Sequence, residues 1–138
     1  MGRALQYDPE HVQFRSMVRD FVHKEIVPRH EQWEDAQQVD RSLFTAAGSL
    51  GLLGFPVPEQ YGGPGIEDFR YHAILIEEIC RAGAAAEGIA VCLQNDVVLP
   101  YLTDLTTDEQ KARWLPGVVS GQTVLGIAMT EPGTGSDL

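Results

Sequence analysis

The apolar residues in the first part of the chain recur at three- and four-residue intervals. They are Phe14, Met17, Val18, Phe21, Val22 and Ile26. This spacing predicts one buried face of a helix, with the charged residues between them facing water. Asp8-Pro9-Glu10 is a typical helix start, because it combines an N-cap carboxylate, a proline at the first helical position and an acid in the first turn. Pro28 ends or kinks this helix near Val27, and residues 31–39 are expected to form a polar connection.

Capping residues and apolar spacing predict further helices as far as residue 121. Asp40 and Asp68 are N-cap residues for two of them. The helix after Asp68 is expected to bury Phe69, Ala73, Ile76, Ile79 and Cys80. Residues 83–94 are rich in glycine and alanine and predict a second buried helix, whose small residues allow either close helix packing or space for a ligand. Thr107 and Gln110 form a capping box for the last helix.

Two segments depart from the helical pattern. Residues 54–65 hold three prolines and four glycines and are expected to form a shaped loop, either functional or a plain connector. Residues 123–129 (TVLGIAM) are uncharged and partly β-branched, which predicts a strand. The expected fold is mainly α, with about six helices followed by the first strand of a β region. A strand needs a hydrogen-bonding partner, so we expect either a partner chain or, preferably, a longer protein.

Composition and charge narrow the possible functions. The chain has 138 residues, of which 43% are hydrophobic, and this suits an ordinary folded domain. Twenty acidic and ten basic side chains give a net charge of −10 without a basic cluster, which argues against nucleic-acid binding. The longest uncharged apolar stretch, 88–95, is far shorter than the ~20 residues that span a bilayer. No signal-peptide pattern is present, so a cytoplasmic or equivalent reducing compartment is expected.

Several residue types that often carry chemistry have simpler interpretations here. Cys80 and Cys92 lack metal-ligand spacing and are interpreted as small core residues rather than a disulfide. The histidines of the N-terminal segment are interpreted as surface residues, not ligands: His11, His23 and His30. Three helical glutamates are expected to be solvated or at packing edges: Glu77, Glu78 and Glu87. The sequence therefore predicts no metal site.

The strongest candidate for binding chemistry follows the predicted strand. Residues 130–137 read TEPGTGSD, with two glycines and three hydroxyl side chains. Glycines let the backbone turn and approach a ligand closely, and hydroxyls supply neutral hydrogen-bond donors. The segment matches neither a Walker loop nor the dinucleotide-binding glycine fingerprint. On these residues alone, a ligand-binding turn and an ordinary polar turn are equally favoured.

Three ordered segments resemble the acyl-CoA dehydrogenase family. Residues 128–137 (AMTEPGTGSD) resemble its signature. Residues 50–65 (LGLLGFPVPEQYGGPG) are similar to its glycine-proline loop after the second helix, and residues 108–121 (DEQKARWLPGVVSG) to its helix before the first strand. The resemblance covers essentially the whole chain. It implies an all-helical N-terminal domain, residues 1–122, followed by the beginning of a middle β-domain, residues 123–138.

The resemblance also implies an activity. Family members bind FAD and oxidise an acyl-CoA thioester to the trans-2-enoyl form, as in fatty acid β-oxidation. By position, the residues implied to contact the cofactor are Ile127, Ala128, Met129, Thr130, Gly135 and Ser136. Thr130 is implied to bond the pyrimidine edge of the flavin, and Ser136 to reach the pyrophosphate and the CoA side of the substrate. Gly88 and Cys92 are implied to line the acyl pocket, although tight helix packing explains them equally well.

The catalytic base and the partners follow from the same resemblance. The family's catalytic glutamate belongs to a C-terminal helical domain, so none is expected within these residues, and Glu131 is expected to stabilise its turn. Electron-transfer flavoprotein is the implied acceptor, and a homodimer or homotetramer the implied assembly. The alternatives are a flavin monooxygenase or nitroalkane oxidase of the same fold, or a helical interaction domain without activity. A protein limited to these residues is expected to be folded, colourless, inactive and prone to self-association.

Overall fold

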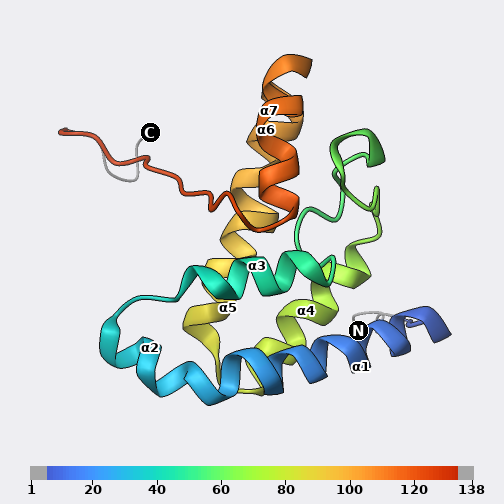
Figure 1. The fold of residues 1–138 in the computed structure, drawn as a ribbon, viewed down its shortest axis with the longest axis vertical. Coiled ribbons are helices and arrows are strands. Elements are labelled where there is room, and N and C mark those ends of the chain that lie inside the picture. Colours follow the sequence, from blue (N-terminus) through green and yellow to red (C-terminus); the bar gives the residue numbers. More distant parts are fainter. Residues whose placement is uncertain (1–5, 134–138) are drawn as a thin grey trace.

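The computed structural model describes residues 6–133, which form a helical body and an extended C-terminal arm (Figure 1). The α-helices are α1 (Pro9–Phe21), α2 (His30–Ala36), α3 (Arg41–Ser49), α4 (Phe69–Arg81), α5 (Ala85–Cys92), α6 (Leu99–Leu105) and α7 (Asp108–Val119). Two π-helical segments (Val22–Ile26 and Leu93–Val98) and two 3-10 turns (Val27–Arg29 and Glu59–Tyr61) join or extend them. The mainly α fold predicted from the sequence is confirmed. Among the described residues, no helix is long and apolar enough to cross a membrane.

Helix α1 begins as its sequence predicts. Pro9 occupies the first helical position, and the backbone N–H of Asp8 donates to Nδ1 of His11, 3.2 Å away. Pro28 does not end the run of helical residues that starts with α1. It lies in a 3-10 turn that passes directly into α2. The expected polar connection over residues 31–39 was therefore wrong. The buried Trp33 packs α2 onto the core, and a single large apolar residue is too weak a pattern to reveal a helix.

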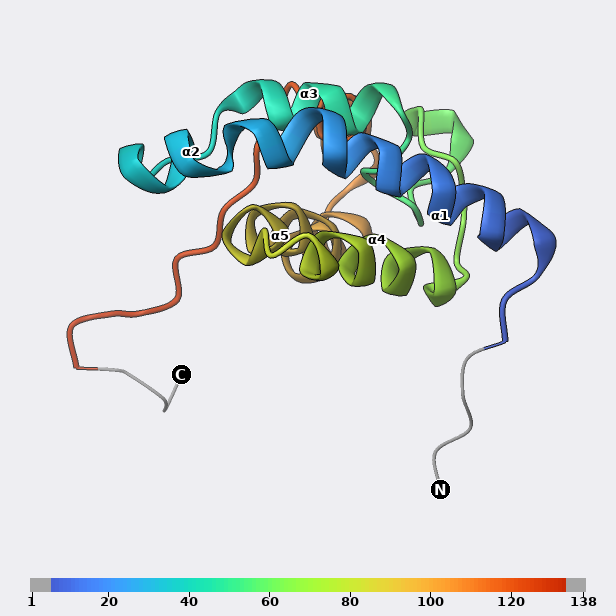
Figure 2. The ribbon, with the colours of Figure 1, turned by 90° about the horizontal axis from the view of Figure 1, so that it is seen from below.

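The body has two helical layers. Helices α1, α2 and α3 form one layer, and α4 and α5 lie below it in Figure 2. Helix α1 packs along α4, and their facing apolar side chains form the main core. Its fully buried members include Val18, Ile26, Leu43, Ile74 and Ile79. The apolar stripe predicted for α1 is confirmed as the face that enters this core.

A second, smaller core holds the upper part of the molecule together. Helix α5 continues through the π-helical segment into α6, which stands beside α7 (Figure 1). Val57, Leu99, Leu115 and Val118 form this core. The predicted loop over residues 54–65 is confirmed, and it joins the two cores, because Phe55 belongs to the first and Val57 to the second.

The buried face of α4 differs from the prediction. Phe69 is 64% exposed and Cys80 is also exposed, whereas Ile74, Leu75, Glu78 and Ile79 are buried. The interpretation of Cys80 as a core residue was therefore wrong. The apolar pattern misplaced the inward face because a carboxylate, Glu78, occupies part of it. Arginine side chains from α1 make that burial possible, as described below.

The predicted strand is not formed within residues 6–133. Residues 124–130 have no regular secondary structure, and no neighbouring strand lies beside them within the described part of the chain. The N–H of Leu125 pairs with the side chain of Gln94 instead of with a second strand. The β-branched pattern could not reveal this, because it carries no information on whether a neighbouring strand is present.

Candidate functional site

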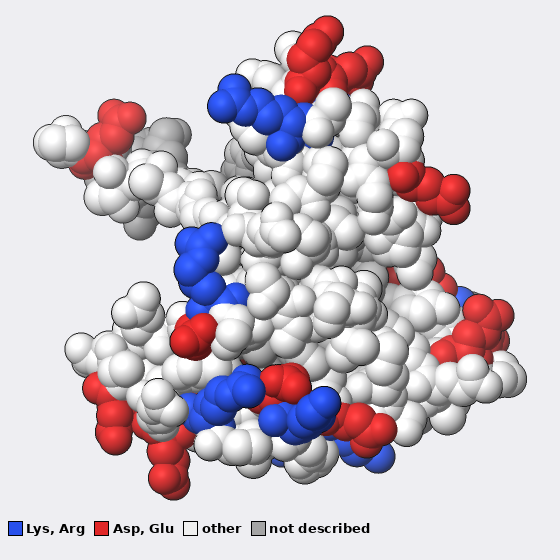
Figure 3. Space-filling view, in the orientation of Figure 1, with Lys and Arg blue, Asp and Glu red and all other residues white. Residues whose placement is uncertain are grey.

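The residues implied to contact a cofactor lie on the arm that leaves the end of α7. Gly126 to Gly133 are exposed, with Ile127 at 37% and Met129 at 48% exposure. Figure 3 shows the arm projecting from the body, its surface almost free of charge apart from a carboxylate near the end. Gly135 and Ser136 lie outside the described residues. Of the implied contact residues, the structure describes Ile127, Ala128, Met129 and Thr130, which are consecutive on this projecting segment.

The root of the arm is fixed by backbone hydrogen bonds to neighbouring helices. The N–H of Thr123 donates to the carbonyl oxygen of Gly117 at 2.9 Å, and the Arg41 guanidinium donates to the carbonyl oxygen of Gln122 at 2.8 Å. Gly121, at φ 75°, makes the sharp turn between α7 and the arm. These contacts hold the start of the arm in one direction while its outer part remains accessible.

A buried glutamine side chain also binds the root of the arm. Gln94 is fully buried, and its Nε2 donates to the carbonyl oxygens of Val118 and Thr123 at 3.3 and 3.4 Å. Its Oε1 accepts from the N–H of Leu125 at 3.2 Å. The sequence analysis assigned no role to Gln94. The available signal was a pair of amides, Gln94 and Asn95, inside an otherwise apolar helical stretch.

The exposed arm offers both apolar side chains and hydrogen-bonding groups, and a flat ring system with polar edges requires both. Ile127 and Met129 are exposed apolar side chains two residues apart. Thr130 offers a hydroxyl beside them. Within residues 6–133, no hydrogen bond from the chain occupies the backbone of Ile127 to Thr130. Apolar side chains can cover the ring face while the hydroxyl and backbone groups bond its edge, so these residues fit a flavin.

Gly88 and Cys92 lie one turn apart on α5, and Gly88 packs closely against α4. A Cβ built on Gly88 would lie 2.9 Å from Cγ2 of Ile79. This contact favours helix packing as the reason for a glycine at position 88. Cys92 is half-buried, and burial raises the pKa of its thiol to about 11. The thiol is therefore protonated near neutral pH and is no nucleophile.

The ionisable groups inside the bundle are paired with one another. Glu78, 4% exposed, accepts from Arg15 Nη1 at 2.8 Å and Arg19 Nε at 2.9 Å, and Arg81 adds a third contact at 3.1 Å. Burial raises the pKa of Glu78, but the hydrogen bonds from Arg19 and Arg15 outweigh it and hold the pKa below its ordinary value. The expectation that Glu78 is solvated was wrong. Its charge is buried because the arginines compensate it.

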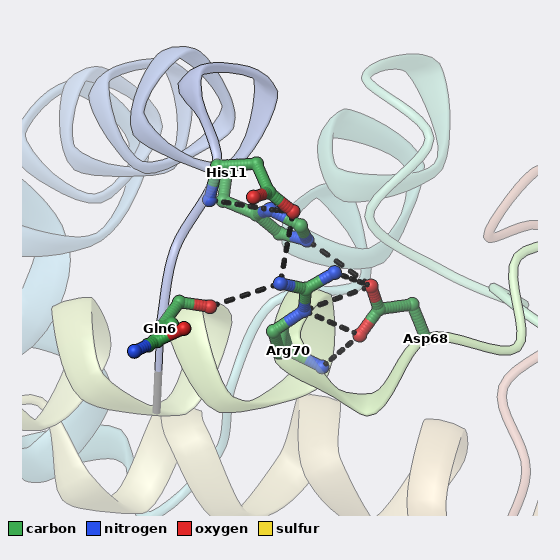
Figure 4. Close-up of polar contacts among 5 residues, drawn as sticks. Gln6, His11, Asp68 and Arg70 are labelled. Atoms are coloured by element: carbon green, nitrogen blue, oxygen red, sulfur yellow. Dashed lines mark hydrogen bonds and ion pairs between the residues drawn. The ribbon is translucent and has the colours of Figure 1, made fainter. Parts of the chain in front are cut away.

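A second network joins the start of α1 to the start of α4 (Figure 4). Arg70 donates to both carboxylate oxygens of Asp68 and to Oδ2 of Asp8, and His11 Nε2 lies 3.3 Å from Asp68. The hydrogen bonds from Arg70 hold the pKa of Asp68 well below its ordinary value. His11 is 3% exposed, so its interpretation as a surface residue was wrong. The network fastens two helix N-termini together and lies away from the arm.

A third cluster, at α2 and α5, is the one group of potential metal ligands in the described residues. The ligand atoms of His30, Glu34 and Glu87 all lie within 4.8 Å of one another. His30 Nδ1 is 2.9 Å from Oε1 of Glu87, and this hydrogen bond raises the pKa of His30. Glu87 is fully buried, against expectation; its Oε1 pairs with His30, and its Oε2 is buried without a hydrogen-bond partner among the described residues. The pair acts as an ion-paired link between the layers.

Comparison with known proteins assigns the chain to a family. A sequence model described as "Acyl-CoA dehydrogenase, N-terminal domain" matches residues 8–122. The chain belongs to the acyl-CoA dehydrogenase family. It is 40% identical over 138 residues to the long-chain specific acyl-CoA dehydrogenase, mitochondrial, of Rattus norvegicus, covering all of this chain and 31% of that protein. An acyl-CoA dehydrogenase of Bacillus subtilis is 39% identical over 128 residues, which are 93% of this chain and 33% of that protein.

Solved structures agree with the sequence match. The crystal structure of acyl-CoA dehydrogenase from Geobacillus kaustophilus superposes with a TM-score of 0.88 at 39% identity, over 98% of this chain and 35% of that one. The acyl-CoA dehydrogenase from Bacillus anthracis complexed with FAD gives 0.84 at 35% identity, over 96% and 22%. The chain spans about a third of the length of the curated relatives it matches. It therefore corresponds to their N-terminal helical part.

Proposed function

We propose that this chain is the N-terminal portion of an FAD-dependent acyl-CoA dehydrogenase that oxidises an acyl-CoA thioester to trans-2-enoyl-CoA. The observation that carries the proposal is the anchored arm, whose exposed segment presents Ile127, Met129 and Thr130 without hydrogen bonds to the rest of the described chain. Membership in the family and the FAD in the similar Bacillus anthracis structure support FAD as the group that this segment meets. We divide the protein after residue 122 into the helical domain and the start of the β-domain.

FAD, when bound, would supply the acceptor for the hydride that leaves the substrate β-carbon. Ile127, Ala128 and Met129 would contact the flavin ring, and the Thr130 hydroxyl would bond its pyrimidine edge. Gly135 and Ser136, which lie outside the described residues, would contact the pyrophosphate and the CoA side of the substrate. Hydrogen bonds to the flavin edge hold the ring and tune its electron affinity, which is the usual contribution of protein to cofactor chemistry.

Three helical glutamates are poor candidates for the proton-abstracting base. Glu78 is held by three arginines, and Glu77 is 2.6 Å from the Arg15 guanidinium. Glu87 is buried against His30. A general base must reach a substrate proton in its ionised form, and these ion pairs hold the three carboxylates elsewhere. We therefore propose that the base lies outside the described residues, in the C-terminal helical domain that the family resemblance implies.

The proposed partners follow from this activity. Acyl-CoA is the substrate, and fatty acid β-oxidation is the setting that the long-chain relatives suggest. An electron-transferring flavoprotein is the proposed acceptor. A solved structure of the electron-transferring flavoprotein of Acidaminococcus fermentans includes a chain similar to this one, at 26% identity with a TM-score of 0.82. We propose a homodimer or homotetramer in a reducing compartment, cytoplasmic or mitochondrial, in keeping with the free thiols of Cys80 and Cys92.

Anaerobic reduction of the purified full-length protein tests the proposal. The protein should carry FAD, and its visible flavin absorbance should bleach when acyl-CoA thioesters of graded chain length are added, with the enoyl-CoA product formed. Free CoA is the control and should leave the spectrum unchanged. A flavin that no acyl-CoA bleaches, but that a nitroalkane reduces, would overturn the dehydrogenase proposal in favour of the oxidase alternative. A full-length protein that retains no FAD would favour the interaction domain.

A further inference from the structure

Gln94 is a buried amide whose hydrogen bonds end on the last turn of α7 and on the root of the arm. It is fully buried in the π-helical segment that continues α5. Its three partners are the carbonyl oxygens of Val118 and Thr123 and the N–H of Leu125. A buried amide is tolerated only where its donors and acceptor are satisfied, and here the satisfying groups belong to one short segment. The side chain thus connects the interior of the bundle to the arm.

We propose that Gln94 is a positioning residue for the flavin, an inference that rests on the function proposed above. Gln94 binds Thr123 and Leu125, which are two residues apart, and Leu125 is two residues before Ile127. Fixing the carbonyl of Thr123 and the N–H of Leu125 therefore sets the position and direction from which the exposed segment Ile127 to Thr130 leaves the bundle.

The amide group is suited to this task because it donates and accepts at once. Nε2 meets two carbonyl oxygens, and Oε1 meets one N–H, so only one orientation of the amide satisfies all three partners. The other anchors of the arm, from Arg41 to Gln122 and from Thr123 to Gly117, act earlier in the chain. Within residues 6–133, Gln94 makes the last side-chain hydrogen bond to the arm before the exposed residues proposed to face the cofactor.

The neighbouring residue provides a matched control. Asn95 is 3% exposed, and its side chain accepts from the N–H of Gly54 and donates to the carbonyl oxygen of Leu52, both at 2.9 Å. Gln94 and Asn95 are thus adjacent buried amides of equal chemistry that bind different segments. Loss of either removes buried hydrogen bonds and lowers stability. Only the loss of Gln94 should alter the arm.

The experiment compares Gln94→Met with Asn95→Leu in the full-length holoenzyme, since each keeps the shape of the side chain and removes its hydrogen bonds. Both variants should melt at a lower temperature than the wild type. Gln94→Met alone should shift the flavin midpoint potential, lower kcat and bind FAD roughly tenfold more weakly, as the loss of one or two neutral hydrogen bonds predicts. Asn95→Leu should keep the wild-type potential and FAD affinity.

Two outcomes would overturn the inference. One is a folded Gln94→Met enzyme with wild-type FAD affinity and midpoint potential, and the other is an equal change in Asn95→Leu. If Gln94→Met does not fold, Gln94→Glu takes its place, because it keeps the acceptor for Leu125, loses both donors and should change the same flavin properties. A wild-type protein without FAD would instead refute the proposed function, so the two failures are distinguishable.

Discussion

Gly121 lies directly against the backbone of Phe44, so closely that a Cβ at position 121 would be 2.0 Å from the Phe44 carbonyl oxygen. The contact brings the end of α7 onto α3 and starts the arm from a rigid surface. Gly121 also has a φ of 75°, a region that L side chains rarely adopt. Position 121 therefore requires glycine for two separate reasons, backbone conformation and space.

Gly121→Ala should lower the free energy of unfolding by at least about 2 kcal/mol, because conformational strain and overlap with rigid backbone add. Gly62→Ala is the matched control, since Gly62 has a φ of 87° but a Cβ at that position would have no neighbour within 4 Å. It should show only the strain cost of about 1 kcal/mol. Chemical denaturation measures both values. Equal losses in the two variants would contradict the close approach to Phe44.

Glu78 should contribute more to stability than its neighbour Glu77. Glu78→Gln should lower the free energy of unfolding by about 1–3 kcal/mol, because it leaves the arginines around a neutral amide. Glu77→Gln, at a 41% exposed side chain, should cost less than about 1 kcal/mol.

The lowered pKa of Glu78 means that its stabilisation is present above its ordinary pKa of 4.5 and is lost as the pH falls below it. Glu78→Gln should reduce the dependence of the free energy of unfolding on pH below about 4.5. If the variant and the wild type lose stability equally as the pH falls in this range, the result argues against the buried ion pair.

The link between His30 and Glu87 should make stability depend on pH in the opposite direction. Hydrogen bonding to Glu87 raises the folded-state pKa of His30 above its ordinary value of 6.5. The contribution is therefore complete below pH 6.5 and is lost as the pH rises through the folded-state pKa. His30→Gln should abolish this decline in thermal unfolding curves, and Glu87→Gln should do the same. If the decline persists in both variants, another group causes it.

Thr130→Val in the full-length enzyme should weaken FAD binding by about 0.5–1.5 kcal/mol and shift the visible flavin spectrum, because one neutral hydrogen bond to the ring edge is lost. Thr103→Val is a suitable control, since the Thr103 hydroxyl bonds the carbonyl oxygen of Pro100 and the carboxylate of Asp104, both in α6. Fluorescence titration of the apoenzyme with FAD measures the affinity. Identical affinities and spectra for Thr130→Val and wild type would remove Thr130 from the flavin contact.

Gly88→Leu separates the two explanations of that glycine. The 2.9 Å approach to Ile79 predicts a lower melting temperature and an equal loss of activity toward short and long acyl-CoA substrates. Gly83→Ala is a control on the same helical hairpin, because nothing lies within 4 Å of a Cβ there and only its φ of 76° matters. A loss confined to long acyl-CoA, with an unchanged melting temperature, would instead assign Gly88 to the acyl pocket.

Local sequence patterns predicted the helix starts well. Asp40 and Asp68 accept from the N–H groups of Ser42 and Arg70, and Thr107 and Gln110 form their capping box, because these contacts involve residues only two or three positions apart. Partners distant in sequence were not predictable in this way. The burial of Glu78 and Glu87 depends on Arg15 and His30, more than fifty residues away, and nothing local marks such pairs.

The same difference between local and distant contacts decided which residues of the candidate site could be predicted. The motif around Thr130 was recognisable because its residues are contiguous in the chain. Gln94 was not, since its role depends on the folding of α7 back onto the π-helical segment, which brings residues 24 and 31 positions away to its amide. Gly121 was predicted only as a helix end, and its contact with Phe44 appears only in the folded structure.

If the exposed segment from Ile127 to Thr130 lies against the flavin, FAD should protect its backbone amides. Amide hydrogen exchange of the full-length protein, followed with and without FAD, measures this protection. Exchange at residues 126–130 should be fast in the apoenzyme and strongly slowed once FAD is bound, while the amides of α1 and α4 exchange at similar rates in both states. Equal exchange of residues 126–130 with and without FAD would contradict this contact.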